Sequence, residues 1–147
     1  MSVAERNRSA WFLLDTHTLL WMVEDHPRLG VETAKALNRA SREDHIAVSA
    51  ITPWEIALLV SKKRIDLRQD LVEWVSAALS LPGVHLMPLD PEIAVASARL
   101  PFEMHPDPAD RILVATARHL NAILVTADKV LLGFSRKGYF EGLDATS

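Results

Sequence analysis

The chain has 147 residues, of which 49% are hydrophobic and 24% charged, a composition typical of one folded domain and unlike a disordered or repetitive chain. It contains no cysteine, which excludes disulfides, thiolate zinc sites and a cysteine nucleophile. The net charge of -3 argues against a protein that binds nucleic acid through bulk positive charge alone.

The first residues of the chain are polar. We predict a flexible N-terminal extension over residues 1–10, followed by one domain over residues 11–143, with residues 144–147 fraying. Residues 1–10 lack the apolar core of a signal peptide, and no stretch is apolar enough to span a membrane. With the lack of cysteines, this predicts a cytoplasmic protein without a membrane partner.

Short apolar runs alternate with segments whose apolar residues recur at helical spacing. The runs predict strands at residues 11–15, 46–50, 84–89 and 122–126. The helical spacing predicts helices at residues 16–25, 31–43, 53–63, 70–80, 91–100 and 108–120. This order predicts a three-layer α/β/α sandwich with a mostly parallel central sheet.

Four acidic residues lie where predicted strands end or the following helices begin. Asp15 ends the first strand in LLDTHTLLW, and Asp128 follows the strand AILVT in LVTAD. Glu55 lies in the helix of SAITPWEIALL, and Asp110 in the helix of DPADRILVATA. Because the carboxyl ends of parallel strands meet at one edge of a sheet, we expect the four side chains to converge there.

Each acid alone also fits a structural role. Thr52 and Glu55 have the spacing of a capping box, in which Thr52 would be the N-cap. Asp107 precedes a proline and is predicted to be an N-cap, with an outer contact to a metal left open. Asp15 and Asp128 also fit plain N-caps. The caps and the cluster are therefore alternative interpretations of the same residues.

The four acids as a set are harder to explain by capping. Two carboxylates about 4 Å apart repel by about 4 kcal/mol at an effective dielectric constant near 20, unless a cation lies between them. An all-oxygen ligand set favours a hard cation, Mg²⁺ or Mn²⁺. Such ions activate water and stabilise the leaving oxygen of a phosphodiester, which is the chemistry of metal-dependent nucleases and phosphatases.

The motifs LLDTHTLLW, SAITPWEIALL, DPADRILVATA and LVTAD, in this order along residues 11–140, resemble a PIN domain of the VapC-like toxins from type II toxin–antitoxin pairs. The resemblance implies a Mg²⁺- or Mn²⁺-dependent endoribonuclease, often a homodimer, that an antitoxin inhibits by placing its tail in the active-site groove. Its motif positions fall on the four acids already singled out. We predict Asp15, Asp110 and Asp128 as direct or water-bridged metal ligands and Glu55 as a ligand or a residue that orients water. Thr16 and Thr126 are predicted to orient carboxylates.

Two other functions stay open: a PIN-like module that binds RNA or a partner with little catalysis, and a small-molecule phosphatase. His17 and His105 are predicted to have surface or capping roles. RNA contacts would come from local basic groups, namely Lys62, Lys63, Arg64, Arg111, Arg118, Lys129, Arg136 and Lys137. A homodimer is predicted from the apolar residues Trp54, Leu71, Trp74, Val75 and Leu79, with burial inside one chain as the alternative.

Overall fold

A computed structural model describes residues 10–104 and 106–147 of the chain. The predicted flexible extension, residues 1–10, therefore lies outside the described residues except for Ala10, which packs partly buried against the core. Five parallel strands form one sheet in the order β3-β2-β1-β4-β5. The strands are β1 (Phe12–Leu14), β2 (Ile46–Ser49), β3 (Val84–Met87), β4 (Ile123–Thr126) and β5 (Glu141–Asp144).

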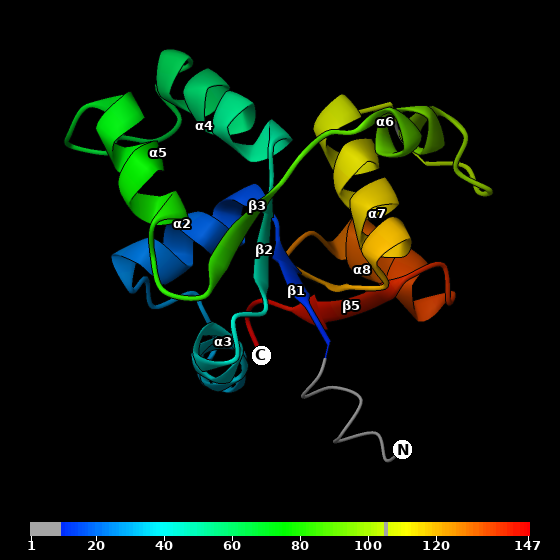
Figure 1. The fold of residues 1–147 in the computed structure, drawn as a ribbon, viewed down its shortest axis with the longest axis horizontal. Helices are drawn as coiled ribbons and strands as arrows, with labels where there is room; N and C mark the ends of the chain where they lie inside the picture. The colour runs from blue at the N-terminus through cyan, green and yellow to red at the C-terminus, as the bar shows by residue number, and fades with distance from the viewer. Residues whose placement is uncertain (1–9, 105) are drawn as a thin grey trace.

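Helices cover both faces of this sheet (Figure 1). One core contains side chains of α2 (Thr16–Glu24), α3 (Val31–Arg42), α4 (Ile51–Ser61) and α5 (Leu71–Leu79). The other contains side chains of α7 (Pro108–Leu120) and α8 (Lys129–Arg136), and α6 (Pro91–Ala98) packs against α7. The predicted three-layer α/β/α architecture is confirmed.

Strand β1 shows how the short apolar runs make these two cores. Successive side chains of a strand point to opposite faces, so Leu14 lies in the first core and Leu13 in the second. Both side chains are fully buried, and burial of each stabilises the fold by about 1.5–3 kcal/mol. A central strand buried on both faces is typical of a parallel sheet, which explains why its sequence shows no polar alternation.

The end of the chain differs from its prediction. Helix α8 and strand β5 are absent from the predicted elements, and residues 144–147 do not fray. Ala145 is fully buried, and its backbone N–H donates to Thr126 O at 2.9 Å. The Ser147 carbonyl accepts from Thr33 N at 3.1 Å, and a side chain at Gly30 would collide with it. This contact explains the glycine at position 30.

The interior of one chain also covers much of the apolar surface from which a homodimer was predicted. Trp74 is 4% exposed, and Leu71, Val75 and Leu79 pack partly buried against the first core. Only Trp54 of the five residues stays largely exposed. The homodimer stays a prediction, with less support than the sequence indicated. No helix among the described residues is long and apolar enough to cross a membrane.

Candidate active site

The sheet order creates a crevice beside the central strand. From β1 the chain connects through α2 and α3 to β2 on one side, whereas β4 pairs with β1 on the other side. Ligands of open parallel sheets bind at such a switch point, beyond the carboxyl ends of the strands. A pocket of about 550 Å³ lies there, lined by Asp15, Glu55, Asp107, Asp110 and Asp128. The structure thus brings the four predicted acids together and adds Asp107.

Asp15 has a structural role and a place in the pocket at the same time. Its Oδ1 accepts from the Thr18 backbone N–H at 2.8 Å and so caps α2. Its Oδ2 accepts from the Thr126 hydroxyl at 2.5 Å. Burial raises the pKa of Asp15 above 3.8, and the hydrogen bonds from Thr126 and Thr18 oppose this rise. The predicted N-cap is confirmed and does not exclude a second role.

Thr126 connects Asp15 with Asp128 through one buried hydroxyl. Its Oγ1 donates to Asp15 and accepts from the Asp128 backbone N–H at 3.0 Å. Asp128 in turn caps α8, because its Oδ1 accepts from Val130 N at 2.8 Å and from Leu131 N at 3.2 Å. The two carboxylates that follow β1 and β4 are therefore fixed relative to each other.

Glu55 does not form the predicted capping box. Helix α4 begins at Ile51, so Thr52 lies within the helix, and its Oγ1 is buried without a hydrogen-bond partner among the described residues. The Thr52 N-cap prediction is wrong because the helix starts earlier, directly after β2. The Glu55 carboxylate instead accepts from the Thr16 hydroxyl. Burial, and then the charges of Asp107 and Asp15, raise the pKa of Glu55.

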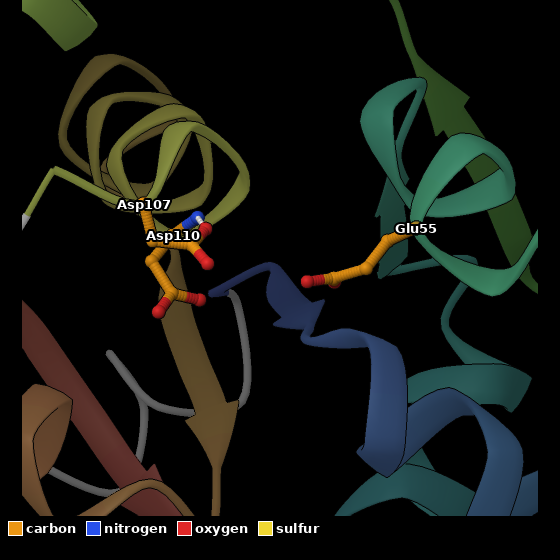
Figure 2. A group of neighbouring side chains, drawn as sticks. All are labelled: Glu55, Asp107 and Asp110. Atoms are coloured by element: carbon orange, nitrogen blue, oxygen red, sulfur yellow. Dashed lines mark hydrogen bonds between the residues drawn. The ribbon is translucent and has the colours of Figure 1, made fainter. Parts of the chain in front are cut away.

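Asp107 and Asp110 begin α7 on the opposite side of the pocket (Figure 2). Asp107 is the predicted N-cap: its Oδ1 accepts from the Asp110 backbone N–H at 3.0 Å. Carboxylate oxygens of Glu55, Asp107 and Asp110 all lie within 4.8 Å of one another. Asp107 thus belongs to the cluster as well as to the helix cap. The sequence left such a contact open for Asp107, and it could not decide the point because the direction of this side chain depends on how α7 packs.

Repulsion within this cluster is visible in Asp110. Burial, and then the charges of Asp107, Glu55, Asp128 and Asp15, raise the pKa of Asp110 to about 7. The metal-free cluster therefore retains a proton to a higher pH than an isolated aspartate does. An all-carboxylate donor set at this spacing fits a hard divalent cation, which would release that proton on binding.

Two arginines line the same pocket. Arg64, which follows α4, belongs to one of the predicted basic groups, whereas Arg28, in the loop after α2, was not singled out. Nothing in the sequence around Arg28 indicates a site, because its position depends on the fold of that loop. His17 is an exposed residue of this pocket, and His105 lies outside the described residues.

Two other arginines that were predicted to contact RNA form hydrogen bonds within the chain. Arg111 donates from Nε to Ser97 O at 2.9 Å and from Nη1 to Met104 O at 3.1 Å, so it supports the segment before α7. Arg118 donates to the Tyr139 carbonyl. These bonds are a sufficient structural reason for both arginines.

Comparisons with known proteins agree with this architecture. The PIN domain family model matches residues 12–137. Ribonuclease VapC22 of Mycobacterium tuberculosis is 33% identical over 119 residues, which are 81% of this chain and 88% of that protein. VapBC2 from Rickettsia felis, solved with a DNA fragment from its promoter, has a TM-score of 0.65 at 18% identity, over 90% of this chain and 96% of that chain. FitAcB from Neisseria gonorrhoeae has a TM-score of 0.61 at 21% identity, over 91% of this chain and 97% of that chain. Both structures share the fold.

Proposed function

Since the chain belongs to the PIN domain family, we propose that its acidic pocket is the active site of a metal-dependent endoribonuclease, the toxin of a type II toxin–antitoxin pair. The observation that carries this proposal is the convergence of the acids at the switch point between β1 and β4, with the pKa of Asp110 raised to about 7. The 33% sequence identity to Ribonuclease VapC22, over most of both chains, supports RNA as the substrate.

The proposal assigns a role to each predicted residue. Asp15, Asp110 and Asp128 hold the cation directly or through water, and Glu55 holds it or orients the attacking water. Thr126 and Thr16 keep the carboxylates of Asp15 and Glu55 in place through their hydroxyls. Asp107 caps α7 and adds negative charge to the site.

The cation in this proposal is Mg²⁺ or Mn²⁺, because every donor is a carboxylate oxygen. When bound, such an ion supplies Lewis acidity toward the phosphodiester and lowers the pKa of water. The chain itself supplies the positions of the carboxylates and, in Glu55, a carboxylate suited to accept a proton from the attacking water. Burial of the Asp15, Glu55 and Asp110 carboxylates lowers the local dielectric constant, which strengthens these electrostatic interactions.

The proposed partners are RNA and a cognate antitoxin protein. The similar structure from Rickettsia felis is a VapBC2 complex, and the shared fold is consistent with an antitoxin for this chain as well. We also propose a homodimer, for which Trp54 and Val72 are exposed apolar side chains, 49% and 74% accessible. An RNA-cleaving toxin meets its substrate in the cytoplasm, and we propose that this chain acts there.

Purified protein, free of antitoxin, tests the proposed activity on a pool of cellular RNA. We expect cleavage with Mn²⁺ and none with EDTA, and we expect the Asp128→Asn variant to be inactive while it stays folded. Folded wild-type protein that is stabilised by Mn²⁺ but cuts no RNA would favour the alternative function, a PIN-like module that binds RNA or a partner.

A further inference from the structure

Arg28 and Arg64 put positive charge into an otherwise acidic pocket. Among the described residues, neither guanidinium is in an ion pair, although five carboxylates line the same pocket. Both arginines are exposed, where an ion pair adds little stability, so their guanidinium groups remain available to a ligand. Their separation from the acids indicates a ligand that carries several negative charges.

The two arginines occupy equivalent places on two walls of the pocket. On α2, Asp15 caps the helix, Trp21 lines the pocket further along, and Arg28 follows in the next loop. On α4, Glu55 and Leu59 line the pocket, and Arg64 follows the end of the helix. With a rise of 1.5 Å per residue, Trp21 lies about 9 Å along the helix from Asp15. The pocket thus extends from acids to arginines along both helices.

Arg28 is held in place before any ligand binds. Its guanidinium carbon lies 5.0 Å from the centre of the Trp21 ring, and this ring is 7% exposed. The Arg28 backbone N–H donates to His26 Nδ1 at 3.1 Å, and Gly30 N donates to Ala145 O at 2.9 Å, which attaches the loop to the core. A guanidinium over a ring keeps N–H donors available for other partners, and these suit a phosphate.

We propose that Arg28 and Arg64 are positioning residues that bind phosphates of the RNA strand next to the phosphate that is cleaved. This inference rests on the proposed ribonuclease function. A single strand carries one negative charge per nucleotide, so a strand with one phosphate among the acids and their cation presents further phosphates to the arginines. An acidic protein segment would also match the arginines, but it lacks a scissile phosphate for the acids and their cation, and the binding measurements below distinguish it from RNA.

A second pocket indicates where the strand continues. This pocket, of about 580 Å³, has two cations, Lys63 and Arg64, and one acid, Asp66, in its lining, and Arg64 also lines the acidic pocket. Arg64 is therefore part of the wall of both pockets. A strand that leaves the acids past Arg64 comes next to Lys63, another exposed cation. This continuity favours an extended polyanion over a single small phosphate.

Substitution by methionine tests the inference, because methionine keeps an apolar stem and removes the charge. We compare Arg28→Met and Arg64→Met with Arg42→Met, which changes an exposed arginine of α3 that lines neither pocket. On an RNA that the wild-type protein cuts, we expect KM to rise roughly tenfold in the first two variants, with kcat nearly unchanged. Arg28→Lys should recover part of the loss, since it restores charge without the planar fork.

Salt dependence of binding gives a readout independent of turnover. Each variant is placed in the inactive Asp15→Asn background, and a short fluorescent single-stranded RNA is titrated at several salt concentrations. Each lost phosphate contact should reduce the slope of log K against log salt by about 0.7. The rise in melting temperature with Mn²⁺, measured in proteins that keep Asp15, should be the same in all variants.

Several results would overturn the inference. One is a KM and a salt slope equal to those of Arg42→Met. Another is an unchanged slope with a reduced response to Mn²⁺, which would mean that the arginines act through the acids. A third is an unchanged slope with weaker antitoxin binding, which would identify a protein-binding surface. If the wild-type protein cuts no RNA but the slopes fall as expected, the proposed activity is wrong and the phosphate contacts stand.

Discussion

The hydroxyl of Thr126, at the end of β4, donates to the carboxylate of Asp15, at the end of β1, at 2.5 Å. These two strands are neighbours in the sheet although 111 residues separate the two side chains. The bond connects the centre of the fold directly to the candidate site, because Thr126 is fully buried and Asp15 lines the pocket. Stability and activity should therefore both respond to this hydroxyl.

Replacing Thr126 by valine removes the hydroxyl at nearly constant volume. Asp15 then loses a donor and the Asp128 N–H loses its acceptor, so we expect RNA cleavage to fall about 10- to 100-fold. The free energy of unfolding should fall by about 1–3 kcal/mol. Thr116→Val is the matched control, because Thr116 is also buried and, among the described residues, its hydroxyl donates within α7, to Ile112 O. Equal cleavage by the two variants would remove Thr126 from the site.

The two acids at the start of α7 should respond differently to substitution. Asp110→Asn should abolish cleavage, whereas Asp107→Asn should reduce it only a few-fold, because asparagine caps a helix about as well as aspartate. Loss of the Asp107 charge should also lower the pKa of Asp110 and Glu55. Cleavage rates and Mn²⁺ titrations of both variants check this. Equal loss in both would make Asp107 a metal ligand and would correct the assignment of the third acid.

The raised pKa of Asp110 predicts an unusual dependence of stability on pH. Because this pKa is raised from 3.8 to about 7, the folded chain holds a proton that the unfolded chain releases in this range. The unfolded state binds fewer protons, so the metal-free protein should lose stability as the pH rises from 3.8 towards 7. Melting in EDTA at several pH values should show this loss in the wild-type protein and less of it in Asp110→Asn. Parallel curves for the two proteins would contradict it.

Much of the fold could be predicted from the sequence because its elements are locally consistent. Helix α7 spans residues 108–120 as expected, since a proline and a capping aspartate begin it and an apolar face continues through it. Helix α8 and strand β5 were missed because residues 129–144 contain three glycines, and β5 has only one large apolar residue, Leu143. Pairing with β4 makes this segment a strand, and pairing is not a local property.

The candidate site, like the fold, could be predicted in part from the sequence. Asp15, Glu55, Asp110 and Asp128 could be placed at one edge because a parallel sheet fixes where its strands end. For Asp107 the sequence left a metal contact open without deciding it, and for Arg28 it indicated no place in the pocket, because each position depends on the tertiary packing of its segment. Helix capping and membership of the acidic cluster do not exclude each other for Asp15 and Asp128. Each carboxylate has two oxygens, so it can cap a helix and also face the pocket.

The central claim is that the acids converge to hold a divalent cation, and thermal melting of the wild-type and Asp15→Asn proteins, each with EDTA and with Mn²⁺, tests it most directly. Metal that binds only the folded state adds about 2.7 kcal/mol at 100 times its dissociation constant, so the wild-type midpoint should rise with Mn²⁺. Asp15→Asn relieves repulsion and keeps a cap acceptor, so without metal it should be at least as stable as the wild-type protein, with a smaller rise. A wild-type midpoint that does not change with Mn²⁺, together with a destabilised Asp15→Asn, would contradict the account and leave Asp15 only a helix cap.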